Sequence, residues 1–274
     1  MKIFETSNRT AHTQYENWFK FWFEKDFEPV WWTKWFQAYW HHSITLSVVY
    51  VICIKAGERL MSERKAFELK KTLIFWNVCL AAFSFMGAVR LAEEFVYALS
   101  TFGFKKSICY SASPWGVTAV WALYFAFSKV VELGDTAFLV LRKRPVVFLH
   151  WYHHVTVLVY TWHAGAEHVG AGRWFIGMNY LVHSFMYSYY ALRAMGKRVT
   201  TSISCLVTSL QITQMVVGVF ISANVFSIKR NGETCQQTYE NLYLCFLIYF
   251  TYSLLFLKFF WEAYITNRRK LKSR

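Results

Sequence analysis

The chain has 274 residues, of which 55% are hydrophobic and 20% aromatic, with only 12 glycines and 3 prolines. A soluble domain is usually less apolar, so this composition argues against a soluble globular protein. The formal net charge is +14, and strongly basic chains often bind nucleic acid or anionic lipid. Here the basic residues form short clusters between long apolar runs. Membrane topology is therefore the first explanation for them, and an anionic ligand is the second. Nucleic acid is not expected as a partner.

Seven apolar runs approach the roughly 20 residues that a helix needs to cross a bilayer. They predict an all-α polytopic membrane protein with one domain over residues 1–274, because no linker divides the chain. In chain order, the predicted spans are 36–55, 72–91, 115–141, 146–163, 174–192, 202–228 and 241–264. Residues 1–35 form an N-terminal segment without a signal-peptide pattern, and residues 265–274 form a basic tail.

The loops on one side of these spans hold most of the lysines and arginines, in clusters at 55–71, 142–144, 193–198 and 268–274. Because such residues accumulate on the cytosolic side, we expect a cytosolic C-terminus and a lumenal N-terminus. Asn8 begins the only glycosylation sequon and would then lie in the lumen. Cys109 and Cys235 fall in lumenal loops, where an oxidising environment favours a disulfide between them.

Ionisable residues inside a span cost about 2.5–3.5 kcal/mol at the helix centre, and they therefore mark candidate functional positions. In the third span, Lys129, Glu132, Asp135 and Thr136 share one helical face near the cytosolic end. Two interpretations stay open and are compatible. The group locks helices together by ion pairs, or it positions catalytic groups and a ligand.

Three of the nine histidines lie on one stripe of the fourth span, because His150, His153 and His154 are spaced by three and four residues. The fifth span carries on one face Asn179, His183, Met186, Tyr187 and Tyr190, and the sixth carries Gln211 and Gln214. Buried amides often only hold helices together, so at least one of the two glutamines is expected to be structural.

Histidines grouped inside a membrane favour one of two chemistries. Imidazole is the commonest metal ligand, but membrane di-iron enzymes use several histidine boxes, and only four histidines of this chain lie near one depth. A single metal stays possible. The other chemistry is nucleophilic and acid–base work, in which a neutral imidazole accepts an acyl group from a thioester. Cys205 in the sixth span is a reserve nucleophile.

At these positions the sequence resembles the very-long-chain fatty acid elongase (ELO) family, the 3-ketoacyl-CoA synthases of the endoplasmic reticulum. The matching segments, in order, are KVVELGDT (129–136), RKRP (142–145), HWYHH (150–154), MNYLVHSFMYSYY (178–190), QITQ (211–214) and FFWEAYI (259–265). HWYHH and SYYALRAMGKRV (188–199) are similar to the subgroup that elongates saturated and monounsaturated chains. Branched acyl chains stay possible.

The resemblance implies seven transmembrane helices, six of them forming a barrel around an acyl tunnel closed toward the lumen. It implies a decarboxylative Claisen condensation of malonyl-CoA with a long-chain acyl-CoA, which gives 3-ketoacyl-CoA, CO₂ and CoA without a metal or other cofactor. The CoA phosphates would meet basic residues on the cytosolic side, for which we name Arg142, Lys143, Arg144, Lys197 and Arg198.

The family motif implies that His153 accepts the acyl group. His150 and His154 would move protons or hold malonyl-CoA, and His183 would face them across the tunnel. The expected surrounding residues are Lys129, Glu132, Asp135, Asn179, Tyr187, Tyr190, Gln211 and Gln214. The family also implies a homodimer and association with the 3-ketoacyl-CoA reductase, the 3-hydroxyacyl-CoA dehydratase and the enoyl-CoA reductase.

Lys270 and Lys272 are placed as in the KxKxx retrieval signal of endoplasmic reticulum membrane proteins. Two alternatives of other classes stay open: a histidine–metal membrane oxidase or desaturase, and a non-enzymatic transporter.

Overall fold

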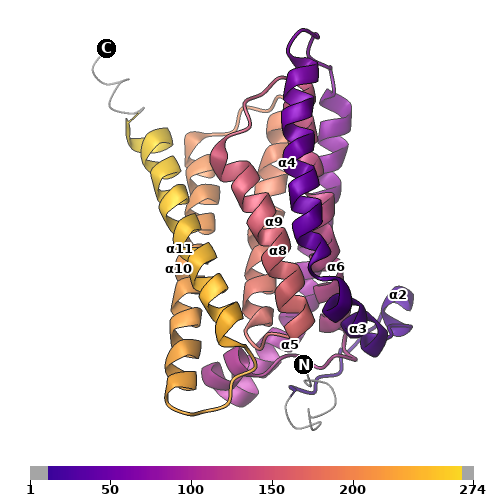
Figure 1. Ribbon diagram of the computed structural model, residues 1–274, viewed down its shortest axis with the longest axis vertical. Helices are drawn as coiled ribbons and strands as arrows, with labels where there is room; N and C mark the ends of the chain where they lie inside the picture. The colour runs from indigo at the N-terminus through magenta and orange to yellow at the C-terminus, as the bar shows by residue number, and fades with distance from the viewer. Residues whose placement is uncertain (1–11, 267–274) are drawn as a thin grey trace.

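The computed structural model describes residues 12–266, and these residues are almost entirely helical (Figure 1). Two short helices, α2 (Trp22–Lys25) and α3 (Pro29–Tyr39), precede the bundle. The bundle consists of α4 (His42–Met61), α5 (Lys70–Cys109), α6 (Val117–Val131), α7 (Gly134–Leu141), α8 (Phe148–Glu167), α9 (Gly172–Ala194), α10 (Thr201–Arg230), α11 (Tyr239–Phe260) and the terminal π-helical turn η2 (Trp261–Thr266). The only β feature within residues 12–266 is an isolated parallel bridge between Thr13 and Ala112.

The long helices alternate in direction, so their connections gather at two ends of the bundle (Figure 1). We call the end with the connections 62–69, 142–147 and 195–200 the basic end. We call the end with the connections 110–116, 168–171 and 231–238 the disulfide end. The described residues before α4, which include α2 and α3, lie at the disulfide end, and α11 finishes at the basic end.

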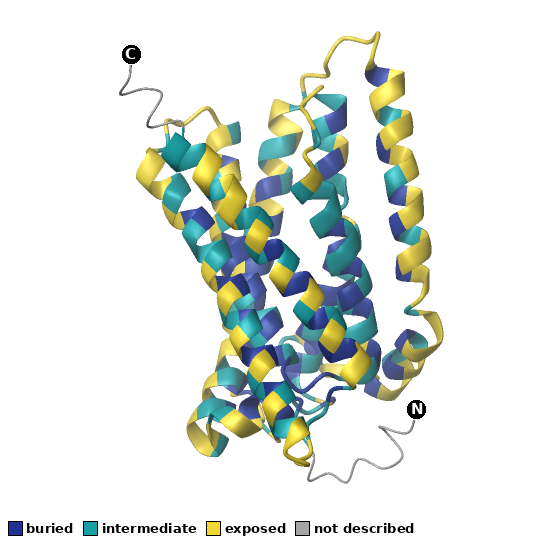
Figure 2. Ribbon diagram, turned by 60° about the vertical axis from the view of Figure 1, so that its left-hand side comes forward, coloured by how far each residue is buried: buried dark blue, intermediate teal, exposed yellow. Residues whose placement is uncertain are grey.

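Four helical segments are long and apolar enough to cross a membrane: Lys70–Cys109, Val117–Leu141, Thr201–Arg230 and Tyr239–Thr266. The other three predicted spans correspond to the helices α4, α8 and α9, which carry more polar residues. Large apolar side chains such as Phe75, Phe220 and Phe250 are exposed. Figure 2 shows exposed positions along most of the helices of the bundle. An apolar outer surface of this kind suits lipid rather than water, and the chain is a polytopic membrane protein.

Several predicted boundaries are wrong. The first span was expected to begin at residue 36, but residues 36–39 complete α3, and α4 begins at His42. The second was expected to end at 91, but α5 continues to Cys109 and bends at Gly103, whose φ of 75° requires a glycine. By contrast, the third, 115–141, agrees with the apolar segment Val117–Leu141, within which residues 132 and 133 separate α6 from α7. Hydropathy marks the apolar core of a helix, but it does not mark where the helix ends.

Arg90 lies inside α5 and is buried there by contact with the N-terminal segment. Its guanidinium donates to Glu24 at 2.8 and 3.0 Å, and Trp121 Nε1 donates to the same carboxylate at 2.7 Å. Burial alone would raise the pKa of Glu24, but hydrogen bonds from Arg90 and Trp121 outweigh it and hold the pKa below its usual value. This pairing explains how α5 tolerates a charge at residue 90.

A second buried ion pair lies where α9 begins. Arg173 Nη1 is 2.7 Å from Glu94 Oε1, and Arg173 Nη2 donates to Thr13 Oγ1 at 3.0 Å and to the Tyr110 carbonyl at 2.6 Å. Thr13 Oγ1 also donates to Glu94 at 2.5 Å. The N-terminal segment, α5 and α9 are therefore joined by one polar cluster.

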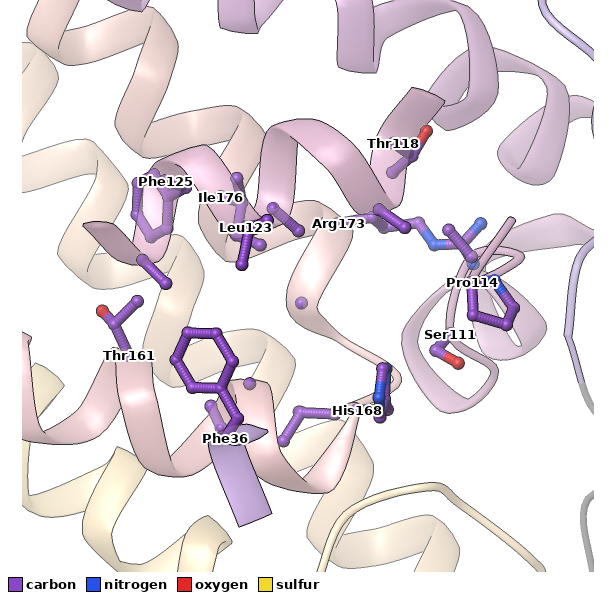
Figure 3. Close-up of a pocket in the computed structure, with 18 of the residues that line it drawn as sticks. Phe36, Ser111, Pro114, Thr118, Leu123, Phe125, Thr161, His168, Arg173 and Ile176 are labelled. Carbon is purple, nitrogen blue, oxygen red and sulfur yellow. The ribbon is translucent and has the colours of Figure 1, made fainter. Parts of the chain in front are cut away.

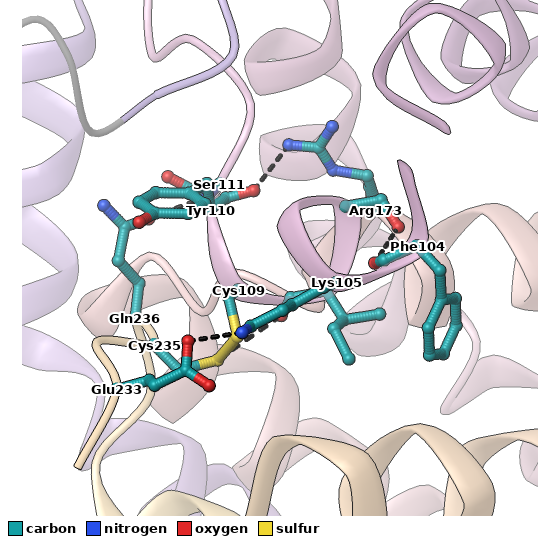
Figure 4. The surroundings of a disulfide bond; sticks show 11 residues. Phe104, Lys105, Cys109, Tyr110, Ser111, Arg173, Glu233, Cys235 and Gln236 are labelled. Carbon is teal, nitrogen blue, oxygen red and sulfur yellow. Dashed lines mark hydrogen bonds and ion pairs between the residues drawn. A yellow bond between two sulfur atoms is a disulfide. The ribbon is translucent and has the colours of Figure 1, made fainter. Parts of the chain in front are cut away.

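Cys109 and Cys235, the two cysteines for which the sequence predicts a bond, form a disulfide that joins the end of α5 to the α10–α11 connection (Figure 4). Next to it, Gln236 donates its backbone N–H to the Cys109 carbonyl at 2.9 Å, and its side-chain oxygen accepts from the Ser111 N–H at 2.7 Å. The disulfide end is thus closed by covalent, ionic and backbone contacts together.

Candidate functional site

The polar residues predicted on the third and fifth spans meet in the interior of the bundle. Lys129, which is 1% exposed, donates to Glu132 Oε1 at 2.8 Å and to Asn179 Oδ1 at 2.9 Å. Its ammonium group also lies 4.2 Å from the centre of the Phe125 ring. A lysine buried this deeply needs compensation for lost hydration, and it receives two hydrogen bonds and a cation–π contact.

His183 is connected to this lysine through Asn179, whose Nδ2 lies 3.1 Å from His183 Nε2. The other ring nitrogen, Nδ1, faces Glu132 Oε2 at 3.7 Å, which is too long for a hydrogen bond. Both of these atoms are buried without a hydrogen-bond partner. Buried polar atoms are nearly always paired, so this gap is a place where a bound group could supply the missing contact.

Asp135 is held by two donors from other helices. Trp76 Nε1 of α5 donates to Oδ1 at 2.6 Å, and the Tyr187 hydroxyl of α9 donates to Oδ2 at 2.8 Å. A Cβ on the neighbouring Gly134 would come within 2.8 Å of the Trp76 ring. Glycine at position 134 therefore permits the tryptophan to reach the carboxylate.

Thr136 carries the network to the histidine stripe. Its Oγ1 lies 2.8 Å from His150 Nε2 and 2.6 Å from the Tyr50 hydroxyl of α4. Lys129, Asp135 and Thr136 thus contact residues of α4, α5, α8 and α9 and link these helices, as the first interpretation predicted. Thr136 also contacts a histidine, and the positioning of catalytic groups or a ligand stays a prediction.

The three histidines of α8 lie together. The His150 and His154 ring centres are 4.5 Å apart, and those of His153 and His154 are 5.6 Å apart. His154 is buried, and its Nδ1 has no hydrogen-bond partner. His153 is only partly buried. Its ring makes no hydrogen bond to any residue in 12–266 and lies 5.1 Å from the Tyr252 ring. Of the four histidines, His153 is therefore the one with both ring nitrogens available and an accessible ring.

Other predicted site residues lie at the margin. Tyr190 is 43% exposed and packs on Tyr187. Gln211 donates to the sulfur of Met186 at 3.3 Å, and Gln214 is buried on α10. Within residues 12–266, no hydrogen bond joins these three side chains to the histidines.

The five residues predicted to meet CoA lie at the basic end, next to the start of α8. Arg142, Lys143 and Arg144 follow α7, and Lys197 and Arg198 follow α9. Lys143 donates to the carbonyls of Ser62 and Arg64 at 2.9 and 3.1 Å. It therefore also holds the end of α4 in place. Asn8, Lys270 and Lys272 lie outside the described residues.

Trp76 and Tyr50 belong to the site, but the sequence did not indicate them. Each is a single aromatic residue in an apolar span, and such residues more often face lipid or line a core. Tyr252 was missed for the same reason: its hydroxyl lies 2.5 Å from Thr156 Oγ1 and donates to the His153 carbonyl at 3.2 Å. Only knowledge of the helix neighbours could have identified them.

A cavity of about 160 Å³ lies in the half of the bundle nearer the disulfide end (Figure 3). Its walls come from α3, α6, α8, the start of α9 and the 111–114 connection, and they are mostly apolar. None of the four histidines lines it. Its inner wall includes Phe125, whose ring also contacts Lys129. The cavity and the polar site therefore share this ring.

Comparison with known proteins assigns the chain to a family. Residues 35–272 match the family model described as ELO, GNS1/SUR4 family. The chain is a member of the ELO family. "Putative fatty acid elongase 3" of Caenorhabditis elegans is 52% identical over 250 residues, which cover 90% of this chain and 78% of that protein. Very long chain fatty acid elongase 6 of Gallus gallus is 45% identical over 251 residues, covering 91% and 94% of the two chains.

Very long chain fatty acid elongase 3 of Homo sapiens is 42% identical over 257 residues, 93% of each chain. Membership in the ELO family and these relatives place the chain in fatty acid elongation, a part of lipid biosynthesis.

Proposed function

We propose that this ELO protein is the condensing enzyme of microsomal fatty acid elongation, which joins malonyl-CoA to a saturated or monounsaturated long-chain acyl-CoA. The observation that carries the proposal is the arrangement around His153. A histidine with a free, accessible ring lies among three further histidines, and a buried polar network orients two of these.

In the first step, an unprotonated ring nitrogen of His153 attacks the thioester carbonyl of acyl-CoA. The C–S bond breaks, the CoA thiolate takes a proton, and the acyl group stays on the imidazole. A neutral imidazole is the nucleophilic form.

In the second step, malonyl-CoA loses CO₂, and the resulting carbanion at its C2 attacks the acyl carbonyl. The C–N bond to His153 breaks, and the imidazole recovers a proton. The overall reaction consumes one proton and releases CO₂ and CoA. His150, oriented by Thr136, and His183, oriented by Asn179, are the groups that we propose to hold malonyl-CoA and to move protons, together with His154.

The acyl chain would run from His153 into the apolar cavity near the disulfide end, while CoA stays at the basic end among Arg142, Arg144, Lys197 and Arg198. This placement requires α4, α8 and α9 to cross the membrane together with the four apolar segments, which makes seven spans. Six of these would surround the tunnel. The basic end would then face the cytosol and the disulfide end the lumen of the endoplasmic reticulum, in keeping with the positive-inside rule.

A homodimer and an association with the reductases and the dehydratase of the elongation cycle are further parts of the proposal. Protein purified in detergent, incubated with radiolabelled malonyl-CoA and a series of saturated acyl-CoAs, should form labelled 3-ketoacyl-CoA and release labelled CO₂. Mass spectrometry of a digest after incubation with acyl-CoA alone should find the acyl group on His153.

An acyl group on Cys205 would contradict the histidine intermediate. Absence of 3-ketoacyl product with every chain length would contradict the condensing activity itself. Stoichiometric iron or zinc in the active preparation would instead favour the histidine–metal oxidase.

A further inference from the structure

Helix α3 places a side chain inside the cavity, although it lies before the first long helix of the bundle. Phe36 reaches from α3 into the space between α6 and α8 (Figure 3) and is 5% exposed. Its ring packs on Trp162 of α8 and on Phe127 of α6, with centres 5.6 and 5.8 Å apart. The cavity therefore meets a bulky aromatic ring supplied by a segment outside the long helices.

Polar contacts on both sides of Phe36 fix α3 against the end of α8. Thr33 Oγ1 lies 2.8 Å from His168 Nε2, and Gln37 Nε2 donates to the Ala166 carbonyl at 3.4 Å. Residues 33, 36 and 37 lie on one face of α3 because they are three and four positions apart. The Phe36 ring is thus held at a definite depth along α8.

Small residues leave the space in front of this ring open. Gly165 is exposed toward the cavity, and a Cβ built on it would lie 3.8 Å from the Phe36 ring, an ordinary contact distance. Other small residues of the wall are Ala119, Ala122 and Ala164. A side chain at position 165 can therefore start beside Phe36 without a clash at its Cβ, and a larger one would take up space in the cavity.

We infer that α3 is the stop that sets acyl chain length, with Phe36 as the specificity-determining residue and the Thr33–His168 hydrogen bond as its support. This inference rests on the proposed acylation of His153. Gly165 follows His153 by twelve residues of one continuous helix, which corresponds to about 18 Å at the α-helical rise. An extended alkyl chain advances roughly 1.25 Å per carbon, from its C–C bond length, so this distance accommodates about 14 carbons.

The test uses the full-length protein with an equimolar mixture of saturated acyl-CoAs and measures the ratio of long to short 3-ketoacyl products. Phe36→Ala should raise this ratio about tenfold, and Gly165→Leu should lower it about tenfold, the effect expected for admitting or excluding two methylene groups. The double variant Phe36→Ala/Gly165→Leu should return toward the original ratio, because one change refills the space that the other opens.

Trp31→Ala is the matched control. Trp31 lies on the same helix, is 56% exposed and does not line the cavity, so its replacement should leave the ratio unchanged. Thr33→Val should broaden the chain-length profile by loosening the support of α3. If Phe36→Ala does not elute as folded protein, Phe36→Leu replaces it in the test. Phe36→Leu should raise the product ratio too, but by less.

Unchanged product ratios in Phe36→Leu and Gly165→Leu, with an active wild type, would overturn the inference and leave the proposed condensation intact. A shift of equal size in Trp31→Ala would also overturn it. An inactive wild type with every acyl-CoA in the mixture would instead remove the proposed function, so the two failures are distinguishable.

Discussion

The disulfide end and the cluster around His150, His153, His154 and His183, which we call the histidine centre, both bury charged or polar groups. The two regions differ in how closely these groups approach a partner. At the disulfide end, Arg90 and Arg173 each contact a carboxylate, at 2.8 and 2.7 Å. In the histidine centre, the closest approach of His183 to a carboxylate is 3.7 Å, and neither atom has a hydrogen bond. The first region also has unpaired buried atoms, Glu94 Oε2 and Arg173 Nε, but each of its buried arginines touches a carboxylate directly. In the second region the unpaired His183 Nδ1 and Glu132 Oε2 face each other across a gap that a substrate could fill.

The largest effect expected from this difference is the loss of activity in His153→Ala. Condensation should fall by about a thousandfold or more, because removal of a nucleophile also removes the step that it performs. The measurement is the rate of labelled 3-ketoacyl-CoA formation. His163→Asn, which changes a histidine near the other end of α8, should retain most of the rate. Equal losses in both variants would show that the effect is not specific to position 153.

Breaking one buried pair in each region sharpens the comparison. Arg90→Met and Lys129→Met each leave a buried carboxylate without its cation, so each should lower the free energy of unfolding by about 3–5 kcal/mol. Only Lys129→Met should also lower the rate per folded molecule, because Lys129 contacts the residue that orients His183. Thermal unfolding in detergent measures the loss of stability. The condensation rate at low temperature, where both variants stay folded, measures the loss of activity. A normal rate in folded Lys129→Met would contradict the role of Lys129 in the site.

Removal of the disulfide tests whether the disulfide end is purely structural. Cys109→Ser/Cys235→Ser should lower the stability by about 2–5 kcal/mol, as for other native disulfides. Reducing agent should lower the thermal midpoint of the wild type but not that of the double variant. Cys53→Ser, at an exposed free cysteine, is the matched control and should behave as the wild type does.

The smallest expected effect concerns pH. Burial, with a smaller contribution from nearby His12, lowers the pKa of His168 to about 4, whereas an unfolded histidine titrates near 6.5. Between these values the unfolded chain binds a proton that the folded protein does not, so stability should fall as the pH falls from about 6.5 toward 4. Between pH 7 and pH 5 the thermal midpoint of the wild type should fall. The fall in His168→Gln should be smaller by about 2–4 °C. Parallel curves for the two proteins would contradict this assignment.

Helical periodicity was sufficient to place the residues that chemistry needs on shared faces. Spacing alone predicted that His150, His153 and His154 would lie together and that Lys129 would lie beside Glu132, because both predictions depend on contacts within one helix. The pairing of Cys109 with Cys235 followed from counting helices, a topological argument that needs no distances.

The features that the sequence could not predict are contacts between helices. Trp76 reaches Asp135 from α5, and Tyr50 reaches Thr136 from α4. Periodicity assigns a residue to a face of its helix, but it does not say how that helix is rotated toward its neighbours. The ion pair of Arg90 could not be predicted for the same reason, because its partner Glu24 lies 66 positions earlier in the chain.

The disulfide also has a consequence for the order of events during synthesis. Cys109 and Cys235 are separated by 126 residues, and the helices α6 to α10 lie between them. The bond cannot form until the ribosome has made all of these helices and both cysteines stand on the same side of the bilayer. A nascent chain that has oxidised this pair has therefore already crossed the membrane an even number of times between residues 109 and 235. Gel mobility without reductant can thus report that both cysteines have reached the same side of the bilayer before any catalytic assay is possible.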